Sequence, residues 1–212
     1  MKEYPIIFSD EMVRAILDGR KTQTRRVIRP QPADGIRPYI FSNDKVQGWV
    51  SSLKHKHGNS TVHICPYGQA GDGLWVRESW QAWKEFDDTK AKDLPEEMRL
   101  RINYTADGNI WDAKKRRSIH MPRCASRILL EITDVRVQRV QDISENDCWS
   151  EGIDAVDGAL DDLKIYEMAK RMNCSFEEAR PTFAVLWDTI NAKRGYGWDA
   201  NPWVWAITFK RI

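Results

Sequence analysis

The chain has 212 residues, of which 42% are hydrophobic and 30% are charged. This composition is typical of a folded globular protein and excludes a disordered chain. With 33 Lys and Arg against 31 Asp and Glu, the formal net charge is only +2, which excludes a strong long-range field. Any binding of nucleic acid therefore has to depend on local basic patches.

Several features predict a cytoplasmic protein that has no contact with a membrane. No apolar run approaches the roughly 20 residues that a membrane span requires. The N-terminal segment MKEYPIIFSDEM contains an early acid and a proline and lacks the long apolar core of a signal peptide. The four cysteines form no CxxC pair, so reduced thiols are the simplest interpretation; they are Cys65, Cys124, Cys148 and Cys174.

The chain is predicted to begin with a short strand followed by a helix. The segment YPIIF indicates a buried strand over Pro5–Phe8. Ser9 is a favourable N-cap residue, and the two acids after it suit the positive end of a helix dipole. Gly19 marks the end of the helix, which carries an apolar stripe of Met12, Val13, Ile16 and Leu17.

The segment DGRKTQTRR, residues 18–26, follows this helix directly and is unusually basic. A solvated turn has this composition, and so does a site that binds phosphate and places a hydroxyl beside an amine. Lys21 and Thr24 are three residues apart, which on an ideal strand directs them to opposite faces. They converge only if Lys21 lies in the turn and Thr24 begins the strand. Arg20, Arg25 and Arg26 are the neighbouring candidates for ligand binding.

Residues 29–63 are rich in proline and turn residues, which indicates an insertion or a long loop with some local strand structure. Near the end of this segment and just beyond it lie four residues of the types that can ligate zinc: His55, His57, His63 and Cys65. Their spacing matches no standard zinc pattern, so we expect no metal, although the spacing alone leaves metal binding open.

The segment GDGLWVRESW contains the clearest strand signal of the chain. Leu74, Val76, Glu78 and Trp80 alternate with more polar residues, so they share one face of the strand. The alternation directs the carboxylate of Glu78 inward. A buried ion pair without a catalytic role and a general acid/base both fit such a residue.

The second half of the chain combines strands and helices with two further polar excursions, at 84–118 and 155–180. The segment SRILLEITDVRVQRV predicts two strand halves joined by a bulge or bend near Asp134. Ser144 and Gly152 bound a short predicted helix. A second helix follows Pro181, and the final segment WVWAITFKRI alternates like a strand; the helix carries a stripe of Phe183, Leu186, Trp187 and Ile190.

Two further segments combine basic residues with features that suit a polynucleotide or nucleotide ligand. The run KKRRSIHMPRCASR contains Arg123 and Arg127, and a solvated face is the alternative interpretation. The segment NAKRGYGWD contains Lys193, Arg194 and Trp198. Its glycines would let the backbone approach a ligand, while arginine and aromatic rings suit phosphates and bases. A helix cap followed by a turn explains the same residues.

Short strands separated by long turn-rich connections, with three or four helices, predict an α+β domain built on a small antiparallel or mixed β-barrel. We expect one domain over residues 1–212. No GxGxxG motif and no repeated strand–helix–strand pattern is present, which argues against a dinucleotide-binding fold. We therefore expect no cofactor, and we infer no oligomeric state.

Two segments resemble the signatures of the ASCH family, whose fold is related to the PUA RNA-binding barrel. The first is a G-x-K-x-x-T-x-R pattern after a short helix, matched by Gly19, Lys21, Thr24 and Arg26. The second is a G-D-x-L-x-V-x-E strand that ends in Glu78. The segments IHMPRCASRI and INAKRGYGWDANPWVW are similar to the larger phage- and prophage-encoded members. The resemblance implies a PUA-like β-barrel of the ASCH type with flanking helices.

The resemblance also implies a function. Small bacterial members with this pattern hydrolyse the acetamide of N4-acetylcytidine with a lysine, a threonine and a glutamate. Carried over to this chain, Thr24 is the nucleophile, Lys21 activates it and Glu78 is the general acid/base. The leading hypothesis is therefore an amidohydrolase that acts on an N-acylated nucleoside.

Two other classes of function remain open at this stage. One is an RNA-binding or ribonuclease module that uses the same basic cleft. The other is a phage accessory protein that binds a host protein. The long excursions favour neither class by themselves, because they can close the cleft, widen it for a polynucleotide or form a partner surface.

Overall fold

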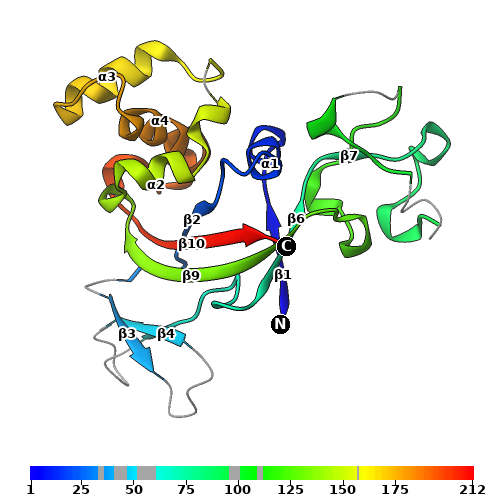
Figure 1. Ribbon diagram of the computed structural model, residues 1–212, viewed down its shortest axis with the longest axis horizontal. Coiled ribbons are helices and arrows are strands. Elements are labelled where there is room, and N and C mark those ends of the chain that lie inside the picture. The colour runs from blue at the N-terminus through cyan, green and yellow to red at the C-terminus, as the bar shows by residue number, and fades with distance from the viewer. Residues whose placement is uncertain (33–35, 41–46, 52–60, 96–100, 109–111, 157) are drawn as a thin grey trace.

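The computed structural model describes the whole chain except residues 33–35, 41–46, 52–60, 96–100, 109–111 and 157. Its centre is a five-stranded mixed sheet with the strand order β1-β6-β9-β10-β2 (Figure 1). Strands β1 and β6 are parallel, and the other neighbouring pairs are antiparallel. The strands are β1 (Glu3–Ile7), β2 (Gln23–Val27), β6 (Gly73–Arg77), β9 (Leu129–Arg139) and β10 (Trp203–Arg211).

The predicted α+β class is confirmed, and in place of the predicted small β-barrel the described residues form a five-stranded mixed sheet in which no closed barrel is found. Strands β1 and β2 lie at the two edges of the curved sheet and do not pair with each other. Helix α1 (Asp10–Leu17) connects these two edges.

The local signals around α1 and β6 are confirmed. Gly19 adopts a positive φ of 77°, as a glycine that ends a helix commonly does. The four residues expected on the inner face of β6 and just beyond it are all buried: Leu74, Val76, Glu78 and Trp80. The predicted bulge is also present, because the pairing register of β9 and β10 shifts between Thr208 and Phe209, opposite Asp134 and Ile132.

The helices form a second layer on one side of the sheet (Figure 1). They are α2 (Glu145–Ser150), α3 (Asp162–Met172) and α4 (Ala179–Asn191). Ser144 caps α2 by accepting a hydrogen bond from the Asp147 backbone at 3.1 Å, as predicted. Strand β10 is buried on both faces. Val204 packs with buried residues of α2, α3 and α4, while Trp205 and Ile207 pack in the main core, which the sheet forms with α1.

All three polar excursions contain regular structure, and the local strand structure predicted in residues 29–63 is confirmed. Residues 29–63 contain the strands of the sheet β3-β4-β5, and the described part of residues 84–118 contains β8, which pairs with β7. Residues 155–180 contain α3, which was not predicted. The bounds of the added strands are Ile36–Ile40 for β3, Gln47–Ser51 for β4, Thr61–His63 for β5, Trp80–Gln81 for β7 and Asn103–Tyr104 for β8.

Short 3-10 helices link these elements. They are η1 (Lys84–Phe86), η2 (Ala91–Asp93), η4 (Thr105–Asp107), η5 (Ser118–His120), η6 (Arg123–Ala125), η7 (Val140–Asp142), η8 (Ile153–Val156), η9 (Ala192–Arg194) and η10 (Trp198–Ala200). Within the described ranges, no helix is both long and apolar enough to span a membrane.

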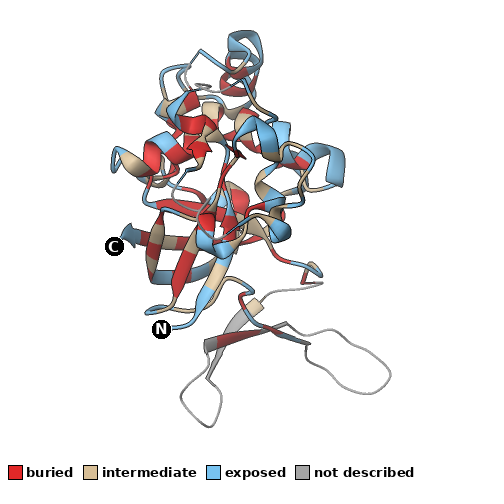
Figure 2. Cartoon of the chain, turned by 90° about the vertical axis from the view of Figure 1, so that its right-hand side faces the viewer, coloured by how far each residue is buried: buried red, intermediate tan, exposed pale blue. Residues whose placement is uncertain are grey.

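Figure 2 shows that buried residues concentrate in the main sheet and the elements packed on it, while the β3–β4 hairpin projects to one side. The hairpin is joined to the core by Trp49, whose ring makes an edge contact with Trp205 at a centroid distance of 4.8 Å. The main core combines residues of α1 with residues of β1, β6, β9 and β10. This packing fixes the position of α1 against the sheet.

Replacing Leu130 with alanine is expected to lower the free energy of unfolding by about 2–5 kcal/mol, because Leu130 is completely buried in the main core and its removal leaves a cavity. The matched control is Leu163→Ala on α3, where the side chain is 65% exposed and the change should stay within about 0.5 kcal/mol. Denaturant unfolding measures both. Equal effects in the two variants would contradict this description of the core.

Candidate functional site

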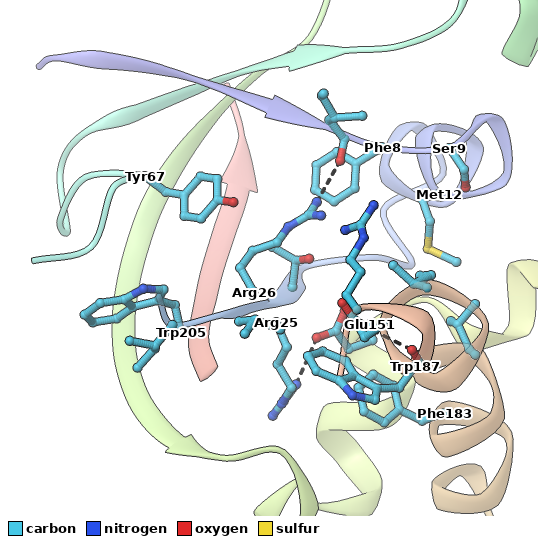
Figure 3. Close-up of a pocket in the computed structure, with 18 of the residues that line it drawn as sticks. Phe8, Ser9, Met12, Arg25, Arg26, Tyr67, Glu151, Phe183, Trp187 and Trp205 are labelled. Atoms are coloured by element: carbon cyan, nitrogen blue, oxygen red, sulfur yellow. Dashed lines mark hydrogen bonds and ion pairs between the residues drawn. The ribbon is translucent and has the colours of Figure 1, made fainter. Parts of the chain in front are cut away.

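A cavity of about 810 Å³ opens beside β2, between the α1 side of the sheet and helix α4. We call it the central cavity. Its wall includes residues from the end of β1, α1, β2, the 62–67 segment, the loop after α2, and α4. Figure 3 shows several of these side chains, and the cavity is lined by both apolar rings and charged groups. Its volume lies within the range of pockets that bind small organic ligands.

The central cavity contains two of the three predicted catalytic residues. Lys21 lies in the turn before β2, and Thr24 is the second residue of that strand; both line the cavity and both are buried. Lys21 therefore lies in the turn and Thr24 near the start of the strand, as their spacing requires if both are to face one site. Gly19 contributes by ending α1 with a positive φ, after which the chain reverses into β2.

Lys21 donates three hydrogen bonds from its ammonium group. The acceptors are the Gln23 carbonyl at 2.9 Å, the Glu151 carbonyl at 2.6 Å and the Glu151 carboxylate at 2.9 Å. Burial lowers the pKa of Lys21, while the charge of Glu151 opposes this effect. Since three acceptors match the three protons of an ammonium group, the resting state is the charged form.

Glu151 is the carboxylate of the central cavity, and sequence reasoning missed it. It follows the six-residue helix α2, and its backbone carbonyl binds Lys21, so a cation lies at the negative end of the helix. Gly152 comes next with a φ of 76°, and a Cβ there would lie 2.9 Å from the Cβ of Lys21. The Ser144–Gly152 helix signal thus identified the element but not its contact with a residue 130 positions earlier.

Arg25 is held by the same carboxylate and is completely buried. Its guanidinium binds Glu151 at 3.1 Å and Asp147 at 2.8 Å, and it also binds the side chain of Gln23 at 2.7 Å. In Figure 3 Arg25 points toward the rings of α4, away from Arg26. The Arg25 side chain lines the cavity, but its two acidic partners already neutralise it.

Arg26 points to the other side of β2 and connects this edge strand to β1, the strand at the opposite edge of the sheet. Its guanidinium donates to the Ile7 carbonyl at 2.7 Å and lies 5.2 Å from the centre of the Phe8 ring (Figure 3). Its Nε atom is buried without a hydrogen-bond partner. Among the described residues no carboxylate forms a salt bridge with it, and burial lowers its pKa. Arg26 is therefore available to bind a polar atom of a ligand.

Glu78 does not line the central cavity. It is fully buried just after β6, and Arg127 binds both of its carboxylate oxygens at 3.0 Å. Arg127 also binds Asp107 and lies 4.0 Å from the centre of the Tyr104 ring. Burial raises the pKa of Glu78, and Arg127 acts in the opposite direction. This cluster joins the β7–β8 region to the main sheet, so the structure separates Glu78 from Lys21 and Thr24.

The other predicted binding residues are dispersed. Arg20 pairs with Asp18 and Asp154 at the surface, and Arg123 pairs with Glu3. Arg194 lines the central cavity, whereas Lys193 is exposed and does not.

Trp198 is a core residue. It is 4% exposed and contacts Phe183 with a ring-centroid distance of 6.2 Å. The ring has no free face for stacking on a base, so its predicted role in ligand binding is not supported. The helix-cap and turn interpretation of that segment is the one its geometry fits.

The described residues contain no group of three metal-ligating side chains. His55 and His57 lie outside the described residues. His63 is buried and lines the central cavity, and burial lowers its pKa. Cys65 is buried in the main core, where burial raises the pKa of its thiol to about 12. A protonated thiol is a poor metal ligand and a poor nucleophile.

Comparisons with known proteins add only a distant structural likeness. No family model matches the chain, and no curated protein sequence matches it. Among solved structures it is similar to protein EF3133 from Enterococcus faecalis V583, described with the family model DUF984. The TM-score is 0.39 at 10% sequence identity, and the alignment covers 100% of this chain and 81% of the other. A likeness this remote has no bearing on the chemistry of the cavity.

Replacing Glu151 with glutamine is expected to lower the free energy of unfolding by about 3–5 kcal/mol, because two buried cations then lose their shared charge partner. The matched control is Asp154→Asn, which breaks an exposed ion pair with Arg20 and should cost less than about 1 kcal/mol. Denaturant unfolding compares the two. If both variants were destabilised by the same small amount, Glu151 would not hold the site together.

Proposed function

We propose that the central cavity binds an N-acylated nucleoside, such as N4-acetylcytidine, and hydrolyses its amide. The observation that carries this proposal is the placement of Lys21 and Thr24 in the wall of one cavity that has the size of a ligand pocket. An amine and a hydroxyl in the same buried site are the groups that acyl transfer requires. The resemblance to the ASCH signatures supplies the substrate class.

In the proposed reaction, the Thr24 hydroxyl attacks the acyl carbon of the substrate. Its proton passes to the neutral amine of Lys21 and then to the departing nitrogen of the nucleobase. Water hydrolyses the resulting threonine ester and releases the carboxylic acid. The charged resting state of Lys21 has to lose one proton first, and the burial that lowers its pKa favours this deprotonation.

Arg26 is the group best suited to bind the acyl oxygen. Its charge is not neutralised by a carboxylate among the described residues, and its buried Nε atom lacks a partner. A cation already in place where negative charge develops stabilises the transition state without having to reorganise.

The carboxylate of the proposed site is Glu151. The ASCH resemblance implies this role for Glu78, but both oxygens of Glu78 are bound by Arg127 outside the cavity wall. Glu151 lines the cavity and binds Lys21 directly. We therefore assign Glu151 to positioning the amine, and Glu78 to anchoring the adjacent substructure. Membership of the ASCH family remains part of this proposal.

A second candidate function is binding of a nucleoside or RNA without catalysis. Two observations favour it: the three protons of Lys21 already have acceptors, and Glu78 is separated from the other two predicted catalytic residues. The third hypothesis, a phage accessory protein that binds a host protein, has no specific support in the described part of the chain.

Thr24→Ala is expected to reduce the release of acetate from N4-acetylcytidine by at least about 10³-fold, because it removes the attacking hydroxyl. Thr24→Ser keeps a hydroxyl at the same position and is the matched control, with a rate within about tenfold of the native one. Acetate and cytidine are quantified together, and the melting temperature confirms that each variant is folded. Full activity in Thr24→Ala would refute the assignment of the nucleophile. Absence of turnover in the native protein would favour the binding function.

The rate at low substrate concentration is expected to rise with pH until the pH reaches the lowered pKa of Lys21 and to stay constant above it. The neutral form of Lys21 is the active one, and its fraction grows about tenfold per pH unit as long as the pH lies below its pKa. Burial lowers this pKa from its ordinary value, so the rise begins at a lower pH than for an exposed lysine. Measuring kcat/KM over the whole pH range in which the protein stays folded tests the assignment, and a profile with no rising limb anywhere in that range would exclude Lys21 as the base.

A further inference from the structure

A second cavity, which we call the basic cavity, has a volume of about 770 Å³ and lies in the part of the chain that carries η1, η2 and β7. Lys90 and Lys92 line one side of it, and the run 114–117 lines the other. Arg77, at the end of β6, also contributes to the wall. Against these seven cations the lining contains two acids, Asp87 and Asp88.

This local excess of positive charge contrasts with the net charge of +2 for the whole chain. In the central cavity, Lys21 and Arg25 are neutralised by Glu151 and Asp147. In the basic cavity, Lys115 binds Asp10. No salt bridge is found for Lys90, Lys114 or Arg117 among the described residues. Charge that is concentrated and not neutralised internally attracts an anionic ligand.

Two arginines of the basic cavity lie against tryptophan rings. The guanidinium of Arg77 lies 5.4 Å from the centre of Trp75, and that of Arg116 lies 5.2 Å from the centre of Trp80. Arg77 also donates to the Ile119 carbonyl, and Arg116 donates to the Phe86 carbonyl. Both Nε atoms are buried without a hydrogen-bond partner. These contacts orient the guanidinium groups of Arg77 and Arg116. Neither group forms a salt bridge with an acid in the described ranges.

The wall of the basic cavity is connected to the wall of the central cavity through β1, β6 and α1. Ile7 lines the central cavity and Arg77 lines the basic one, and these two residues are directly paired in the parallel register of β1 and β6. Lys115 of the basic cavity binds Asp10 at 3.1 Å, in the first turn of α1. The neighbours of Asp10, Ser9 and Glu11, line the central cavity. Figure 1 shows α1 between the β7 region and the helices that flank the central cavity.

We propose that the basic cavity binds the sugar–phosphate backbone of a single-stranded polynucleotide. The nucleoside that enters the central cavity is then one residue of that chain, and the neighbouring phosphates lie among the lysines of the basic cavity. This second step rests on the proposed function, whereas backbone binding does not. A single strand fits this arrangement because its bases can leave the stack and enter a protein pocket, which a base in an intact duplex cannot do.

The experiment measures binding of a fluorescent single-stranded oligonucleotide to the full chain across a range of salt concentrations. The affinity of the native protein should fall steeply with salt, because phosphate contacts release counterions. The double variant Lys114→Gln/Arg117→Gln should bind more weakly. Its salt slope should fall by about 0.7 for each phosphate that it no longer neutralises. The matched control, Lys164→Gln/Lys170→Gln, removes the same charge from exposed positions on α3 and should bind like the native protein.

Each result decides one part of the proposal. Absence of salt-dependent binding, or equal weakening in both double variants at unchanged melting temperatures, would overturn the assignment of the basic cavity. If oligonucleotide binding behaves as expected and N4-acetylcytidine is not hydrolysed, the basic cavity stands and the proposed function falls. If acetylated cytidine within an oligonucleotide reacts no faster at limiting concentration than the free nucleoside, the link between the two cavities is overturned.

Discussion

The ion pairs that Glu151 makes with Lys21 and Arg25 are the interaction on which the central cavity depends. Two cations are removed from water on one short stretch of chain, and their burial would be costly without a shared anion. Glu151 supplies that anion from the end of α2, so the helical layer cannot separate from β2 without exposing unpaired charge. The backbone N–H of Thr22 also donates a hydrogen bond to the Ser150 carbonyl at 2.9 Å, which adds to the attachment of α2 to the segment before β2. The wall of the cavity and the attachment of α2 to the sheet are therefore one structural feature.

A second charged side chain, that of Arg26, connects the two edge strands of the sheet. Strands β1 and β2 are the first two strands of the chain, and α1 lies between them in sequence. They are the two edge strands of the sheet and do not pair with each other. Instead, Arg26 reaches from β2 to the Ile7 carbonyl at the end of β1, and the Phe8 ring lies against the guanidinium. The side chain of Arg26 thus connects β2 to β1, although the two strands share no backbone hydrogen bonds.

Local features of this fold could be predicted from the sequence because each is encoded within a few residues. Gly19 and Gly152 end helices with a positive φ, and the alternation through Leu74 and Val76 reports the buried face of β6. Partners that are distant in sequence could not be predicted. Glu151 lies 130 residues from Lys21, and nothing in the segment SENDCWSEG indicates which cation it meets. Glu78 shows the same limit, because its inward direction was correct but its partner, Arg127, was not foreseen.

The two cavities use positive charge in different ways, and the difference is physical. Lys21 and Arg25 are buried and neutralised, which fixes their positions to the precision that chemistry at a single atom requires. The lysines of the basic cavity are exposed, and among the described residues only Lys115 forms a salt bridge, which suits a ligand whose phosphates recur along a flexible chain. Arg77 connects the two types: it ends β6 beside Ile7, and its tryptophan contact orients a charge at the border between the cavities. A polynucleotide that occupied both cavities would place one nucleoside against buried, paired side chains and its sugar–phosphate backbone against exposed lysines.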